Sequence, residues 1–130
     1  MAPERILNPA DVDARSDIYA MGAVGYFLLT GKAIFEGENS LEITNQIMHA
    51  PAPRAAASGV EGIPEALDAL LAACLEKDRA RRPQTAEAVI EALDRLSSRL
   101  AWTQPDADAW WSAYRESRKA ATASAVAQPA

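Results

Sequence analysis

One segment of the chain is apolar on nearly every face of a predicted helix, from Ile18 to Leu29. Ser16 fits the N-cap of this helix, and Asp17 fits its first turn, where the helix dipole favours a negative charge. Gly31 supplies a C-terminal stop. A helix without a polar face is expected to be surrounded by protein. The pattern therefore predicts a central helix, although a chain of 130 residues has few other elements to surround it.

Three further segments have the periodicity of helices that bury one face. Residues 40–49 predict a weaker helix, with Leu41, Ile43, Ile47 and Met48 apolar. Pro64 opens a helix whose apolar residues recur at i, i+3, i+4, i+7 and i+8, namely Leu67, Leu70, Leu71, Cys74 and Leu75. Thr85 fits the cap of another, with the stripe Ala86, Val89, Ile90, Leu93 and Leu96. Residues 1–14 are expected to be an irregular lead-in.

The character of the sequence changes after Leu100. All the tryptophans lie in the next stretch, where a helix is expected from Thr103: Trp102, Trp110 and Trp111, followed by Tyr114. Large aromatic side chains favour docking of this helix onto the helical body, and the alternative is a surface for a protein partner. From Ser117 the chain is mostly Ala, Ser, Thr and Lys, which predicts disorder.

The expected organisation follows from these segments. A helical domain spans residues 1–100, a tryptophan-rich helix spans residues 101–116, and a disordered tail spans residues 117–130. No strand pattern of useful length is found in the sequence. The expected fold class is all-α, with about four or five helices.

Composition and charge exclude several classes of function. Thirteen Lys and Arg against 18 Asp and Glu give a net charge of −5, which argues against a binder of nucleic acid or of an anionic membrane. The single cysteine, Cys74, and the single histidine, His49, cannot form a disulfide or a four-ligand zinc site. No apolar run approaches the roughly 20 residues that a spanning helix needs. The start of the chain does not resemble a secretory signal, so a cytoplasmic location is expected.

Three motifs follow one another in a distinctive order. They are Ala2-Pro3-Glu4, then Asp17-Ile18-Tyr19-Ala20-Met21-Gly22, and finally Cys74-Leu75-Glu76-Lys77-Asp78-Arg79-Ala80-Arg81-Arg82-Pro83. Ala-Pro-Glu alone would be weak, since any tripeptide arises by chance, but the ordered set is specific. It resembles the C-terminal part of the large lobe of a bacterial eukaryotic-type serine/threonine protein kinase domain. The resemblance covers residues 1 to about 100 and begins at Ala-Pro-Glu, the motif that closes the activation segment.

The resemblance implies structural roles for particular residues. Glu4 of the Ala-Pro-Glu motif would pair with Arg82. Asp17, which together with Gly22 marks the central hydrophobic helix, would hydrogen-bond the backbone of the catalytic loop. The helix around residues 41–49 would help to dock substrates and partners. Arg79 stands where the family usually has proline, a departure that is expected to affect only a turn.

The charges themselves fit the implied pair. A buried glutamate and a buried arginine need each other, because leaving either charge alone costs about 3–5 kcal/mol. The planar guanidinium suits the role, since it can meet a carboxylate with two parallel hydrogen bonds. Without the resemblance, two ordinary surface charges would be the simpler interpretation of Glu4 and Arg82.

The chemical apparatus of a kinase is missing from this sequence. In the family, the Gly-rich loop, the ATP-binding lysine, the His-Arg-Asp loop and the metal-binding Asp-Phe-Gly aspartate all precede Ala-Pro-Glu. No Gly-x-Gly-x-x-Gly, His-Arg-Asp or Asp-Phe-Gly occurs here. We therefore expect no catalytic, cofactor-binding or metal-binding residue in this chain. ATP and Mg are expected only for a full-length kinase.

Two functions remain open from the sequence. The first is a C-terminal fragment of a serine/threonine kinase domain, the scaffold and substrate-docking part, inactive alone. It is compatible with a separately started gene piece, a truncated gene or a deliberately cut piece. The second is a non-catalytic helical module for protein interaction or regulation. Expected partners are proteins: the missing kinase portion, a substrate or a regulator. Exposed apolar helix faces would also allow self-association.

Overall fold

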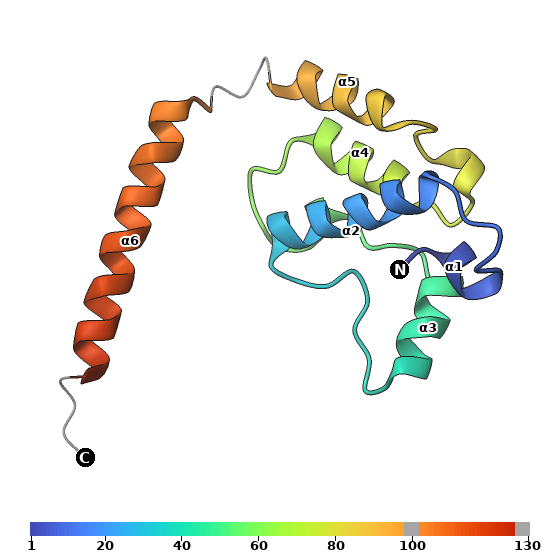
Figure 1. The fold of residues 1–130 in the computed structure, drawn as a ribbon, viewed down its shortest axis with the longest axis horizontal. Coiled ribbons are helices and arrows are strands. Elements are labelled where there is room, and N and C mark those ends of the chain that lie inside the picture. Colours follow the sequence, from blue (N-terminus) through green and yellow to red (C-terminus); the bar gives the residue numbers. More distant parts are fainter. Residues whose placement is uncertain (98–101, 127–130) are drawn as a thin grey trace. The chain divides into compact units, whose positions relative to one another are not determined.

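The computed structural model describes residues 1–97 and 102–126, and within these residues it is helical and contains no strand. The chain divides into two compact units, Met1–Leu96 and Ser97–Ala130. Figure 1 labels the helices, which are α1 (Pro3–Leu7), α2 (Arg15–Thr30), α3 (Ser40–His49), α4 (Glu65–Cys74), α5 (Ala86–Ser97) and α6 (Gln104–Val126). Short 3-10 turns, η1 (Ala55–Ala57) and η2 (Arg79–Arg81), lie in the connections on either side of α4. The predicted all-α class is confirmed.

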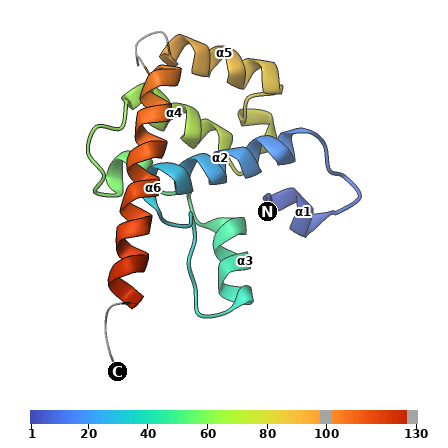
Figure 2. The ribbon, with the colours of Figure 1, turned by 60° about the vertical axis from the view of Figure 1, so that its left-hand side comes forward.

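The first unit is built on the contact between α2 and α4, which lie beside each other in Figures 1 and 2. Two glycines of α2 allow this close approach. A Cβ atom at Gly22 would lie 2.7 Å from Cβ of Cys74, and one at Gly25 would lie 2.6 Å from Cδ2 of Leu71. A Cβ atom at either position would force neighbouring atoms to shift, so both glycines serve packing.

The buried core lies on one side of α2. Its main cluster joins α2 to α4, η1 and the residue before α1, and it contains Ala2, Tyr19, Tyr26, Ala55, Leu71 and Leu75. A smaller cluster brings in α5 and contains Ile18, Cys74 and Val89. The predicted stripes of α4 and α5 therefore supply core residues, as their periodicity indicated.

The opposite side of α2 is exposed, which corrects the expectation that this helix is surrounded by protein. Val24, Phe27 and Leu28 are all more than half exposed. Beside them runs an open apolar groove with a volume of about 200 Å³, lined by residues of α2, α4 and α5 that include Met21, Leu70 and Leu93. Within the first unit, α4 and α5 cover α2 from one side only.

The start of the chain also differs from the expectation. Residues 3–7 form the short helix α1 in place of an irregular lead-in, with Pro3 in its first turn. Ser16 lies inside α2 and is buried, and it donates a hydrogen bond to Glu4. A five-residue helix is too short to show a periodicity, and the N-cap pattern at Ser16 was overridden by this tertiary contact.

The second unit contains α6, and the Asp106 side chain caps the N-terminus of this helix. The Asp106 carboxylate accepts hydrogen bonds from both the backbone N–H and the hydroxyl of Thr103, at 2.8 Å and 2.6 Å. The helix continues to Val126, past the expected boundary at residue 116 and into the segment predicted to be disordered. This segment is rich in alanine, which has a high helix propensity, although it lacks the large apolar residues from which a helix was expected. Residues 127–130 of that segment lie outside the described residues.

None of the helices that the structure describes is long and apolar enough to cross a membrane.

Candidate functional site

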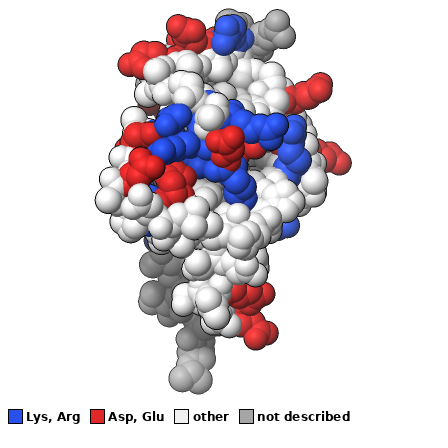
Figure 3. Space-filling model, turned by 90° about the vertical axis from the view of Figure 1, so that its right-hand side faces the viewer, with Lys and Arg blue, Asp and Glu red and all other residues white. Residues whose placement is uncertain are grey.

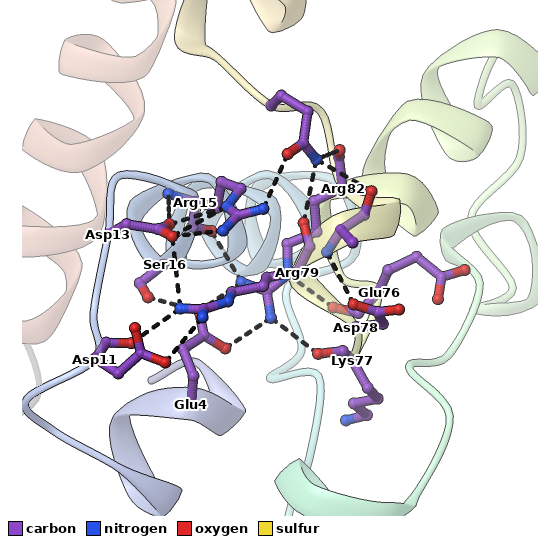
Figure 4. A network of polar contacts seen from close by, with 12 residues as sticks. Glu4, Asp11, Asp13, Arg15, Ser16, Glu76, Lys77, Asp78, Arg79 and Arg82 are labelled. Carbon is purple, nitrogen blue, oxygen red and sulfur yellow. Dashed lines mark hydrogen bonds and ion pairs between the residues drawn. The ribbon is translucent and has the colours of Figure 1, made fainter.

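Figure 4 shows a polar network where α1, the start of α2 and the connection between α4 and α5 meet. At its centre is Arg82, whose side chain is 0% exposed, paired with Glu4, whose side chain is 13% exposed. The Arg82 Nη1 and Nη2 groups donate to Oε1 and Oε2 of Glu4 at 2.7 Å and 2.8 Å. The structure thus brings together the two residues that the resemblance paired, in the bidentate geometry that gives strong charge-assisted bonds.

The remaining donors of Arg82 are all used by backbone carbonyls. Its Nε donates to the carbonyl oxygen of Glu76 at 2.8 Å, and Nη1 donates to that of Arg15 at 2.9 Å. Its Nη2 donates to that of Lys77 at 3.1 Å. A guanidinium has five N–H donors, so every one has a partner here. One side chain therefore fastens α1, the start of α2 and the α4–α5 connection to one another.

The environment of the pair holds Glu4 in its charged form. The hydrogen bonds from Arg82 outweigh the effect of burial, and with the Ser16 hydroxyl they lower the Glu4 pKa from 4.5 to about 2. The ring of Tyr19 lies 5.0 Å from the Arg82 guanidinium carbon, close enough for a cation–π contact. Burial raises the Tyr19 pKa to about 12, and its hydroxyl has no hydrogen-bond partner among the described residues.

A second, more exposed ion pair extends the network to the segment between α1 and α2. Arg79 donates from Nη2 to Oδ2 of Asp11 at 2.8 Å and from Nη1 to the Asp11 carbonyl oxygen at 3.0 Å. Its Nη1 also lies 3.5 Å from Oδ2 of Asp13. The expectation that Arg79 affects only a turn is therefore wrong, because its long side chain reaches across to another segment. Figure 3 shows basic and acidic side chains intermingled on this face.

Asp13 also pairs with the residue two positions along. Arg15 donates from Nη2 to Oδ2 of Asp13 at 2.6 Å and from Nη1 to Oε1 of Gln84 at 2.9 Å. The hydrogen bonds from Arg15 lower the Asp13 pKa well below its usual range. Both residues are partly exposed, so this pair contributes less than the buried one.

Other residues singled out by the sequence lie apart from the network. Asp17 is exposed, and its carboxylate accepts no hydrogen bond from the residues that the structure describes. Its implied role toward a catalytic loop stays a prediction. The aromatic residues of the second unit form their own stack: the Trp110 and Tyr114 rings lie 5.3 Å apart and parallel, with Trp111 edge-on to both. These three and Trp102 are all exposed.

Sequence reasoning missed a buried carboxylate, Asp68 of α4. It accepts a hydrogen bond from Nε of Arg54 at 2.8 Å and one from the backbone N–H of Ala56 at 3.1 Å. Burial acts to raise the Asp68 pKa, but these bonds outweigh it and lower the pKa. A signal was present, because Asp68 shares a helix face with Leu71 and Leu75, and an acid within an apolar stripe indicates a buried partner.

The contacts of the network are structural and hold segments of the chain together. Its charged groups are satisfied by one another and by backbone carbonyls. Among the residues that the structure describes, no group of three or more His, Cys, Asp or Glu side chains could hold a metal ion. What the arrangement does is hold α1 against α2 and against the α4–α5 connection.

Comparison with known proteins gives a consistent result. The family model for the protein kinase domain matches residues 1–92. The serine/threonine-protein kinase PknL of Mycobacterium tuberculosis is 35% identical over 101 residues, which cover 78% of this chain and 25% of that protein. The probable serine/threonine-protein kinase PknB of Bifidobacterium longum is 40% identical over 87 residues, 66% of this chain and 12% of that protein. The match thus spans at most a quarter of each of these relatives.

Removing either member of the buried pair should destabilise the first unit. We expect Arg82→Met to lower the free energy of unfolding by about 3–5 kcal/mol, because Glu4 is left buried without its partner. Glu4→Gln should also lower the free energy of unfolding. The double variant should lose less stability than the sum of the losses of the two single variants. Urea denaturation measures all three. Glu116→Gln, which breaks the exposed Lys119–Glu116 pair, is the control and should change stability by less than about 1 kcal/mol. Strict additivity of the Glu4 and Arg82 variants would contradict the coupling.

Acid should weaken the unit through Glu4. The pKa of Glu4 is lowered in the folded state, so the pair stabilises above pH 4.5, and this contribution is lost as the pH falls from 4.5 toward 2. A shift of this size corresponds to about 3 kcal/mol. Glu4→Gln has no carboxyl group to protonate, so its stability should fall by that much less over the same window. Parallel stability curves for the two proteins would contradict this assignment.

Proposed function

The chain belongs to the protein kinase domain family, and from that membership we propose that it is the C-terminal helical part of a serine/threonine kinase domain. In this proposal it acts as a scaffold and substrate-docking part of the large lobe. The whole domain would transfer phosphate from ATP to serine or threonine residues of proteins. The buried bidentate contact between Glu4 and Arg82 is the observation that carries the proposal.

The contact suits a scaffold because of the elements that it joins. Glu4 lies in α1 and is the last residue of the Ala-Pro-Glu motif, which closes the activation segment in the family. Arg82 holds this helix on α2 and on the connection that follows α4. Phosphoryl transfer depends mainly on positioning, so a rigid support beneath the activation segment would contribute to catalysis without touching ATP.

The exposed face of α2 supports the same proposal. A monomeric domain rarely exposes a large contiguous apolar patch. Here Val24, Phe27 and Leu28 are exposed beside an apolar groove, and Asp17 projects from the same helix without a partner among the described residues. Such a surface is what a helix at the centre of a larger lobe would present when its other neighbours are absent.

The proposal includes the absence of catalysis by this chain alone. Incubation of the pure chain with labelled ATP and a generic serine/threonine protein substrate should give no phosphate transfer above background, because the nucleotide-binding motifs are absent from the sequence. A complete bacterial serine/threonine kinase provides the positive control under the same conditions. Transfer that persists after repurification of the chain would overturn this part of the proposal.

A second candidate function is a non-catalytic interaction module. The observation that favours it is the exposed stack of Trp110, Trp111 and Tyr114 on α6, since exposed aromatic clusters are common at protein interfaces. In this case the aromatic cluster would govern association, whereas in the scaffold proposal the exposed face of α2 would govern it.

Self-association through α2 separates the two candidates. Leu28 and Leu41 are exposed to 77% and 78%, but only Leu28 lines the apolar groove. We expect Leu28→Lys to reduce both hydrophobic-dye binding and the sedimentation coefficient of the chain, because it places a charge on the exposed apolar face of α2. Leu41→Lys is the matched control on α3 and should leave both unchanged. Equal effects of the two variants, or a wild-type monomer without dye binding, would count against the scaffold proposal.

A further inference from the structure

Helix α3 packs against the first unit through exposed and partly buried side chains. None of its residues is buried. Its main helix neighbour is the short helix α1, and in Figure 1 it lies apart from α4 and α5. A helix with little buried apolar surface has little of the packing that normally stabilises helices, so α3 depends on its polar contacts.

Most of the polar contacts of α3 are local. The side chain of Asn39 accepts from the backbone N–H of Glu42 at 2.9 Å, and the Glu42 carboxylate accepts from the N–H of Glu38 at 2.9 Å. Gln46 donates to the carbonyl oxygen of Glu36 at 2.8 Å. These bonds join α3 to the loop directly before it and would move with it, so they do not hold it on the rest of the unit.

Lys77 supplies the contact that does. Its Nζ donates to the carbonyl oxygens of Ile47 at 2.7 Å and Gln46 at 3.3 Å. Among the described residues, these are the hydrogen bonds that connect α3 to a residue distant in the sequence. The Gln46 carbonyl also accepts a hydrogen bond from the Ala50 N–H at 2.9 Å, whereas the Ile47 carbonyl lies one residue later, where a helix has no further N–H to offer. The C-terminal end of the helix dipole also attracts a cation.

The same ammonium group also holds the loop before α3. Lys77 Nζ lies 4.3 Å from the centroid of the Phe35 ring, within the range of a cation–π contact. No carboxylate of the described residues forms an ion pair with it. Lys77 itself belongs to the α4–α5 connection, where its carbonyl accepts a hydrogen bond from Arg82. Its backbone is therefore anchored in the buried network while its side chain reaches α3.

We propose that Lys77 is a latch that fastens α3 and its preceding loop to the fixed part of the first unit. When the latch is released, residues 35–50 open as a local unit between Ile34 and Ala52, which pack against the main core, while α2, α4 and the Glu4–Arg82 pair remain in place. A pocket of about 400 Å³ is lined by Lys77 together with His49 and Arg54. The use of this motion in docking rests on the proposed function, because α3 is the docking helix only there.

Amide hydrogen exchange of the full chain tests the latch. We expect Lys77→Met to accelerate exchange of the amides of α3 about tenfold, as expected for the loss of a cation and its hydrogen bonds at a helix C-terminus. The amides of α2 and α4 should keep their rates. Lys77→Arg retains the charge and N–H donors and should restore most of the protection. Lys119→Met removes a lysine that is 75% exposed and is the matched control.

Two results would overturn the latch. Unchanged exchange in α3 would mean that its contacts with Lys77 do not hold it. Equal acceleration of amide exchange in α2, α3 and α4 would make Lys77 a general stabilising residue. A variant that fails to fold would give the same result and count in the same way. The exchange rates do not depend on kinase activity, so phosphate transfer by the chain would contradict the proposed function and leave the latch intact.

Discussion

The first unit depends on the burial of one guanidinium group. Removing a charge from water is costly, and the cost is recovered only when every donor finds an acceptor. Arg82 meets this condition through the Glu4 carboxylate and three backbone carbonyls. One carbonyl belongs to the start of α2 and the other two to the α4–α5 connection. Lysine could not replace it, because an ammonium group concentrates its donors at one point and cannot match a carboxylate in two parallel bonds.

This fastening explains how a half-covered helix keeps its place. The α2 helix has a core on one side and an exposed apolar face on the other, so packing alone holds it from a single direction. The polar network supplies a second constraint at its N-terminal end, where the Arg15 carbonyl accepts from Arg82. The peripheral segments then attach to the same α4–α5 connection, the segment at Asp11 through Arg79 and α3 through Lys77.

The sequence allowed prediction of those elements that carry their own periodic pattern. The helices α4 and α5 bury one face along several turns, so their apolar residues are regularly spaced, and α2 was recognised by its long apolar run. The partnership of Glu4 and Arg82 came from the ordered motifs and not from any local pattern. Helix α1 and the reach of Arg79 and Lys77 were not predictable, because they depend on which segments lie together in space. The continuation of α6 was missed because residues 117–126 contain no regularly spaced large apolar side chains.

The separation of Glu4 and Arg82 along the chain has a consequence for biosynthesis. The two residues are 78 positions apart, so nearly the whole first unit is enclosed by their contact. A nascent chain leaves the ribosome from its N-terminus, at roughly 5–20 residues per second. Glu4 therefore waits for several seconds before its partner is translated. During that interval α1 has no anchor, and the core-facing side of α2 stays uncovered until α4 has been made, so a chaperone would be most useful in this period.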